Sequence, residues 1–109
     1  MTDEQQLQNE IVQYTDSSLA VRDNDAAMFR QRLAVYINRL ITGDFSKLIF
    51  ILYRLDISEQ KLKQLLAGEN QTDAGLLIAN MIIERQLQKI QSRKKYRMRD
   101  DGIADEEKW

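Results

Sequence analysis

Apolar residues recur along much of the chain at the three- and four-residue spacing of amphipathic helices. The clearest stripe covers residues 26–41, and the Asp-Asn-Asp run at 23–25 stands before it with side chains that suit a helix N-cap. Residues 1–25 are mostly polar, but their few apolar positions predict a short helix over about residues 4–14.

Gly43 and Asp44 separate the helix predicted over residues 26–41 from the next one. Glycine tolerates the left-handed backbone that often ends a helix, so we expect Gly43 to adopt it and Asp44 to cap the element that follows. That element, FSKLIFILYRL at residues 45–55, is apolar nearly all round and is expected to form a buried central helix. Its β-branched and aromatic residues leave a strand over residues 48–53 as an alternative, but no second convincing strand is present to pair with it.

Two more helices follow in the pattern. Ser58 is a candidate N-cap for a helix that ends at Gly68. Thr72 or Asp73 is the candidate cap of a last helix over about residues 74–97. At about 1.5 Å per residue this helix would be about 35 Å long, which exceeds what a domain of this size needs for packing. Its first half is apolar, and its second half is polar and basic.

Composition narrows the class of protein. The 109 residues suit one domain, and the formal net charge of −1 provides no overall field that would attract nucleic acid. The chain contains no cysteine and no histidine, so we expect no disulfide, no thiolate chemistry and no typical transition-metal centre. The longest apolar run has six residues, and the N-terminus lacks a signal-peptide pattern. We therefore expect a cytoplasmic protein that does not associate with a membrane.

The sequence contains no pattern that indicates an enzyme. The four glycines form no phosphate-binding loop, and Ser58 has no histidine to activate it. Asp44, Asp56 and Asp73 adjoin apolar segments, but they stand where helix caps are expected. We therefore predict no catalytic residue, no metal ligand and no cofactor. A weaker alternative, an enzyme or small-ligand pocket among the helices, rests only on Tyr36, Tyr53, Arg54 and Glu84.

The second half of the last helix carries a run of positive charge. Residues 85–99, called the basic segment below, contain seven lysines and arginines and no acid. Such a run can bind phosphates in a salt-dependent way, and Tyr96 can stack on an unpaired base, so nucleic-acid association is one interpretation. The simpler interpretation is a solvated helix end whose cations favour the helix dipole. The acidic stretch DDGIADEE that follows predicts a disordered tail rather than a segment folded back onto these cations.

Glu84 and Arg85 interrupt the apolar face of the last helix directly after residues 81–83. We favour the interpretation that both charges face water on the opposite side of the helix, because a buried charge pair costs desolvation energy. The alternative is that they line a pocket or pair with Lys47, Arg54 or a second subunit.

The sequence resembles a recurring pattern in small uncharacterised bacterial proteins. The resemblance lies in two blocks, FSKLIFILYRLDISEQKLKQLLAG and TDAGLLIANMIIERQLQKIQSRKKYR. In these proteins an apolar helix ends in YR-[IL]-D-[IV]-S-E, and a later helix carries IIERQLQKI. The similarity covers about residues 26–97. It implies a helical cytoplasmic protein and carries over no catalytic residue.

Together these features predict an all-α, single-domain bundle of four or five helices with a long C-terminal helix. Residues 1–25 are expected to form a polar N-terminal segment with a short helix. Residues 26–97 are expected to form the bundle, and residues 98–109 an acidic, disordered tail.

The chain also offers more apolar helix surface than a small bundle needs, at residues 45–55, at 76–83 and along the narrow stripe of 83, 87 and 90. We therefore predict a small non-enzymatic protein–protein interaction or adaptor module, whose partner can be a second copy of the chain. Association with nucleic acid is the alternative. The candidate partner-binding residues are Arg85, Lys89, Arg93, Lys94, Lys95, Tyr96, Arg97, Arg99 and Trp109.

Overall fold

The computed structural model describes the backbone of residues 2–68 and 73–103, and the side chains of these residues except 65, 66, 68 and 97–103. Within these ranges the chain is an all-α single domain with a long C-terminal helix, as predicted. Residues 48–53 lie inside a helix, so the strand alternative is wrong. The elements are α1 (Asp3–Tyr14), the short 3₁₀ helices η1 (Ser17–Leu19) and η2 (Arg22–Asn24), α2 (Ala26–Gly43), α3 (Phe45–Arg54), α4 (Glu59–Gly68) and α5 (Ala74–Ile103).

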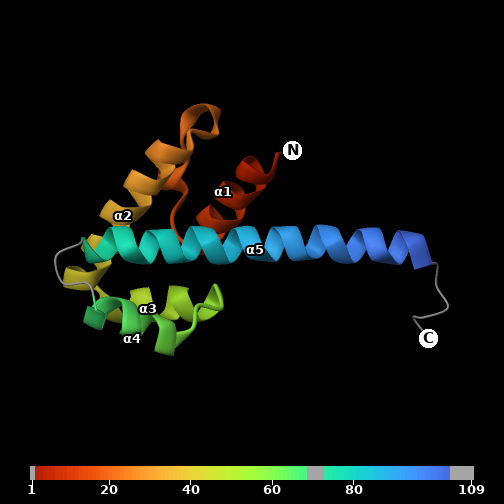
Figure 1. Cartoon of the computed structure of the whole chain (residues 1–109). Coiled ribbons are helices and arrows are strands. Elements are labelled where there is room, and N and C mark those ends of the chain that lie inside the picture. Colours follow the sequence, from red (N-terminus) through yellow and green to blue (C-terminus); the bar gives the residue numbers. More distant parts are fainter. Residues whose placement is uncertain (1, 69–72, 104–109) are drawn as a thin grey trace.

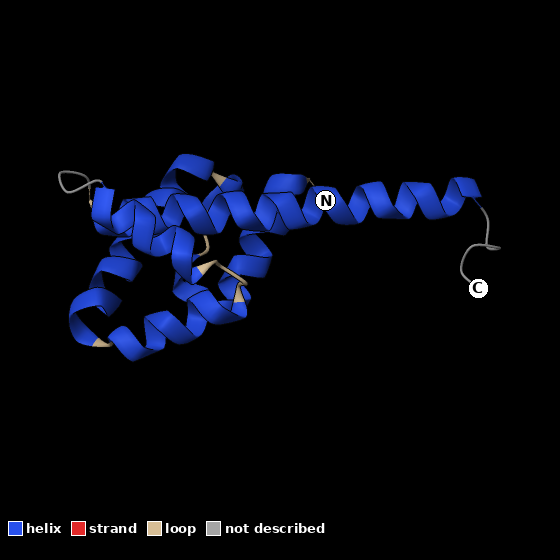
Figure 2. Ribbon diagram, turned by 60° about the horizontal axis from the view of Figure 1, so that its bottom comes forward, coloured by secondary structure: helices blue, strands red, loops and turns tan. Residues whose placement is uncertain are grey.

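Helix α5 is the axis around which the other helices are arranged. Figure 1 shows α1 and α2 on one side of α5 and α3 and α4 on the other. The most extensive packing joins α2 to α5, followed by α1 to α5 and α2 to α3. In Figure 2 the C-terminal part of α5 again extends past the rest of the molecule. This projection makes the molecule elongated, with principal extents of 51 × 33 × 22 Å.

One hydrophobic core lies between α5 and the helices around it. Phe29, Leu33 and Ile37 come from the predicted stripe on α2, and each is at most 1% exposed. Leu7 and Ile11, from the polar N-terminal segment, are 2% and 0% exposed in the same core. Full burial of one such side chain stabilises a fold by about 1.5–3 kcal/mol. The first helix is therefore part of the domain, because its narrow apolar stripe packs on α5.

The predicted helix starts are confirmed by their caps. At each of four starts a side-chain oxygen accepts a hydrogen bond from a backbone N–H two or three residues later, which satisfies one of the free donors of the first turn. The pairs are Asp25 with Met28, Asp44 with Lys47, Ser58 with Lys61, and Asp73 with Gly75, at 2.9–3.2 Å.

The expectation of a left-handed Gly43 is wrong. Gly43 is the last residue of α2, and none of the glycines in the described ranges has a positive φ. The chain turns instead at Asp44, whose φ of −157° and ψ of 71° end α2, while its carboxylate caps α3. Because one aspartate ends one helix and starts the next, no left-handed residue is required.

Helix α3 ends in a Schellman motif at Asp56. The backbone N–H of Ile57 donates to the carbonyl of Leu52 at 3.0 Å, and that of Asp56 donates to the carbonyl of Tyr53 at 3.1 Å. Asp56 adopts the left-handed conformation, with a φ of 65°, at the position where glycine is most common.

Helix α5 is longer than predicted. It continues to Ile103, beyond the expected end at Arg97, so part of the predicted tail is helical. Its 30 residues span about 45 Å. The last six residues, with Trp109, lie outside the described residues. In the described part of the chain, no helix combines the length and the apolar character that crossing a membrane requires.

Candidate interaction surface

Helix α3 is apolar on two sides, and only one of them is covered. Leu48, Ile51 and Leu52 point into the core and are 1–4% exposed. The other side, called the α3 face below, consists of Phe45, Ile49, Phe50 and Tyr53, which are 54%, 45%, 57% and 81% exposed. The expectation of a helix buried all round is therefore wrong. The outer side of α3 is exposed because α3 packs on α2 at the periphery of the bundle, and none of the described helices covers that side.

An arginine and two aromatic rings adjoin the α3 face. The Arg54 guanidinium carbon lies 5.2 Å from the centroid of the Tyr14 ring and 5.5 Å from that of the Phe50 ring. Both distances are in the range of cation–π attraction. Arg54 thus connects the end of α1 to α3, and it adds a charged, aromatic-bound group to the edge of an apolar surface.

The other two apolar surfaces that we expected to be in excess, at residues 76–83 and along the stripe of 83, 87 and 90, are buried or partly buried in the core. Ile90 is 1% exposed, and Ile83 and Leu87 are partly buried against the core. Among the described residues, no large apolar side chain between 76 and 90 is exposed. The α3 face is therefore the main cluster of uncovered apolar side chains on a single described helix.

The start of the basic segment holds the turn between α3 and α4. Arg85 donates from Nη2 to Oδ2 of Asp56 at 2.9 Å and from Nε to the Asp56 carbonyl at 3.3 Å. One turn later, Lys89 Nζ donates to the Leu55 carbonyl at 2.9 Å. The hydrogen bond from Arg85, followed by the positive charges of Arg85 and Lys89, lowers the pKa of Asp56. Burial is the main cause that lowers the pKa of Lys89, although the charge of Asp56 opposes it.

The middle of the basic segment holds α1. Arg93 Nη2 donates to Oε1 of Glu10 at 2.8 Å, and the buried amide of Gln86 donates to the same oxygen. Lys94 forms an ion pair with Asp3 at the start of α1. Burial would raise the pKa of Glu10, but hydrogen bonds from Arg93, Gln6 and Gln86 and the charge of Arg93 together lower it.

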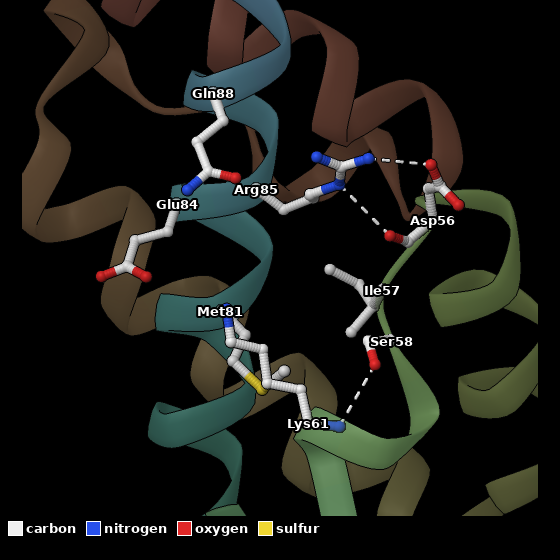
Figure 3. A pocket seen from close by; sticks show the side chains of 8 residues that line it. All are labelled: Asp56, Ile57, Ser58, Lys61, Met81, Glu84, Arg85 and Gln88. Carbon is white, nitrogen blue, oxygen red and sulfur yellow. Dashed lines mark hydrogen bonds and ion pairs between the residues drawn. The ribbon is translucent and has the colours of Figure 1, made fainter.

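Glu84 and Arg85 behave differently from each other. Glu84 is exposed, as the favoured interpretation predicts. Arg85 pairs with Asp56, a partner that the sequence pattern did not suggest, so the prediction that both charges simply face water is wrong for Arg85. Both residues line a cleft beside α5, as the alternative interpretation predicts. Figure 3 shows Arg85 directed toward Asp56, while Glu84 points away from it.

The predicted partner-binding residues do not form one open surface. Four of them, Arg85, Lys89, Arg93 and Lys94, contact their own chain. Lys95 is exposed, and Tyr96 is 67% exposed on the projecting part of α5. Arg97 and Arg99 belong to the helical backbone of α5, and their side chains, like all of Trp109, lie outside the described part of the structure. The α3 face was absent from the predicted site, although the excess of apolar residues at 45–55 was its signal.

A shallow cleft of about 390 Å³ lies between α5 and the start of α4 (Figure 3). It is lined by Asp56, Ile57, Ser58, Lys61, Met81, Glu84, Arg85 and Gln88. The four residues behind the pocket hypothesis do not meet there. Glu84 lines this cleft, Tyr36 lines a separate hollow beside α2, and Tyr53 and Arg54 belong to the outer side of α3.

Comparisons of this chain with models of known protein families, with curated proteins and with solved structures gave no match. The resemblance to small bacterial helical proteins therefore stays a prediction. Among the described residues, the α3 face is the most distinctive surface of the molecule.

Proposed function

We propose that this chain is a protein–protein interaction module that binds its partner through the α3 face. The supporting observation is the exposure of four large apolar side chains on one ten-residue helix. Single exposed apolar residues are ordinary on protein surfaces, but contiguous apolar patches mark binding sites. Removing such surface from water favours association, and the part of this gain that exceeds the entropy cost of association appears as affinity.

The chemistry of the α3 face also supports a protein partner. Aromatic residues and arginine are enriched among the residues that contribute most to protein–protein binding. Phe45, Phe50 and Tyr53 supply the rings, and Arg54 is already held between two rings before a partner binds. A side chain that is ordered in advance loses less conformational entropy on binding.

Nucleic-acid association, the alternative, has less support. Arg85, Arg93 and Lys94 already form ion pairs with Asp56, Glu10 and Asp3, so a phosphate would compete with these carboxylates for the same cations. Those ion pairs hold α1 and the α3–α4 turn against α5. Of the candidate residues whose side chains are described, Lys95 and Tyr96 are the ones that are exposed without such a carboxylate.

Site-specific photo-crosslinking in the natural host tests the proposed function. A photoreactive phenylalanine analogue replaces Phe50 or Tyr53, and in the control it replaces Gln60, which is exposed on α4. We expect one or a few reproducible protein adducts from the two α3 positions and none of these from the control. If neither α3 position gives an adduct, or if the control gives the same ones, the α3 face is not the binding surface.

A further inference from the structure

We infer that the hollow beside α2 is a binding site for a small organic carboxylate with an apolar body. This inference goes beyond the proposed function, because the hollow is lined by α2 and by η1 with its cap Asp16, and none of its lining residues belongs to α3. Its volume of about 520 Å³ is within the usual range for small-molecule sites. Three features of the lining carry the inference: an apolar wall, two arginines and a buried hydroxyl.

The apolar wall of the hollow combines buried and exposed side chains. Leu19 of η1 and Leu40 of α2 are 5% and 8% exposed and belong to the core. Met28 and Val35, which are 43% and 51% exposed, lie two turns apart on one side of α2. A ligand with an apolar body therefore removes from water a surface that is wet in the free protein, and this burial favours binding.

Two arginines on the same side of α2 provide positive charge. Arg32 and Arg39 line the hollow and alternate with Met28 and Val35 at spacings of three and four residues. Arg32 Nη1 donates to the Ala20 carbonyl at 2.8 Å, which fixes the position of its charge. Neither arginine forms an ion pair within the part of the chain that the structure describes. A guanidinium binds a carboxylate through two parallel hydrogen bonds, so we assign Arg39 to the carboxylate of the ligand.

The negative charge of Asp16, which also lines the hollow, favours a carboxylate over a phosphate. The backbone N–H of Ser18 donates to the Asp16 carboxylate at 3.0 Å, and this hydrogen bond is the main cause that lowers the pKa of Asp16. Asp16 is therefore ionised at neutral pH. Two arginines and one ionised acid leave the lining with a formal charge of +1. A ligand with one negative charge matches this balance, whereas a dianionic phosphate ester is repelled more strongly by Asp16.

The Tyr36 hydroxyl is the third feature of the lining. Its oxygen is buried and has no hydrogen-bond partner among the described residues. A buried hydroxyl without a partner is unfavourable, so a ligand that supplies a partner gains affinity. The oxygen is shielded from solvent, and a ligand reaches it after an exposed side chain of the lining, such as Gln31 or Arg39, moves aside. We therefore expect the carboxylate to accept a hydrogen bond from Tyr36 as well as from Arg39.

Titration of the isotope-labelled full chain with phenylhexanoate, followed by NMR chemical shifts, tests the site. This probe has about 14 non-hydrogen atoms, and at ordinary ligand efficiency it should bind with a dissociation constant on the order of 1 mM. We expect saturable shifts concentrated in residues 16–19 and 28–40. Phenylhexylamine, which has the same apolar body and the opposite charge, should bind about five-fold more weakly or not at all.

Arg39→Gln and its matched control Arg30→Gln separate the assigned contact from the overall charge. Arg30 is also exposed on α2, but it lies on the opposite side of the helix from Arg39 and does not line the hollow. We expect Arg39→Gln to raise the dissociation constant of phenylhexanoate about five-fold and Tyr36→Phe to raise it about two-fold, with the helical circular dichroism unchanged. Arg30→Gln should leave it nearly unchanged.

Several results would overturn the inference. One is the absence of saturable shifts up to about 20 mM probe, well above the expected dissociation constant. Shifts centred on α5, or equal weakening by Arg39→Gln and Arg30→Gln, would do the same. Equally tight binding of the amine would show an apolar hollow without selection for a carboxylate, and unchanged binding by Tyr36→Phe would reject the role of the hydroxyl. None of these results bears on the photo-crosslinking of the α3 face, so the two proposals fail separately.

Discussion

The close approach of α5 to α2 at Gly75 predicts that Gly75→Ala destabilises the protein. A Cβ at this position would lie 2.5 Å from the Ala34 carbonyl oxygen and 2.5 Å from Cγ of Asn38. The oxygen belongs to the backbone of α2 and cannot rotate away. The Asn38 amide can rotate, but it accepts a hydrogen bond from the Gly75 N–H at 3.1 Å and donates one to Asp73 at 2.8 Å.

The size of the effect follows from these contacts. Restoring ordinary contact requires α2 and α5 to separate locally by about 1 Å, and such overpacking costs about 1–3 kcal/mol. If Asn38 moves instead, two hydrogen bonds worth about 0.5–1.5 kcal/mol each are weakened. Alanine is more stable than glycine in a helix by about 0.5–1 kcal/mol, which offsets part of this destabilisation. We therefore expect a net loss of about 2 kcal/mol and a fall in Tm of about 10 °C.

Urea unfolding followed by circular dichroism measures this change, and Gly43→Ala is the matched control. A Cβ at Gly43 meets nothing within 4 Å, and Gly43 has no positive φ, so the same substitution should stabilise the protein by about 0.5–1 kcal/mol. The two variants thus have effects of opposite sign. A Gly75→Ala midpoint at or above that of the unmodified chain would refute the reasoning.

Three further predictions concern the contacts of α1 and of the α3–α4 turn. The pKa of Glu10 lies below its ordinary value of 4.5, so the folded state favours the carboxylate. The contribution of Glu10 to the free energy of unfolding is therefore fully present above pH 4.5, and it is lost as the pH falls through the lower pKa of the folded state. Urea midpoints between pH 7 and 3 should therefore fall less steeply for Glu10→Gln, and an unchanged slope would contradict this. Because Asp56 has a φ of 65°, Asp56→Gly should be about 1 kcal/mol more stable than Asp56→Ala in the same assay, and equal stabilities would count against a left-handed residue there. Arg93→Gln breaks a half-exposed ion pair and should weaken the docking of α1 by roughly 0.5–1 kcal/mol, seen as faster hydrogen exchange in α1 only; uniform change along the chain would oppose this assignment.

The starts of the helices could be predicted from the sequence because they depend on local contacts. Asp44 and Ser58 bind backbone groups only three residues away, and nothing distant in the chain changes that requirement. The apolar stripe of α2 is local in the same sense, because its period alone assigns a buried side. The left-handed Gly43 was a local prediction that failed, since Asp44 performs both capping roles.

The candidate site could not be predicted because it depends on tertiary packing. A helix that is apolar all round gives no indication of which side will be covered, and the choice in α3 is made by its position on α2. The cations of the basic segment were similarly ambiguous. Their partners Glu10 and Asp56 are 83 and 29 residues away in the sequence, and only the fold brings them together.

The position of α5 in the sequence has a consequence for the synthesis of the protein. The helices that complete their packing on α5 all leave the ribosome before it does, with the apolar stripe of α2 still open to water. At about 5–20 residues per second, translation of residues 74–90 takes about 1–3 s. Until α5 has also emerged from the ribosome, the apolar side of α2, with Phe29, Leu33 and Ile37, lacks its most extensive packing partner. The emergence of α5 therefore sets the earliest time at which this core can close.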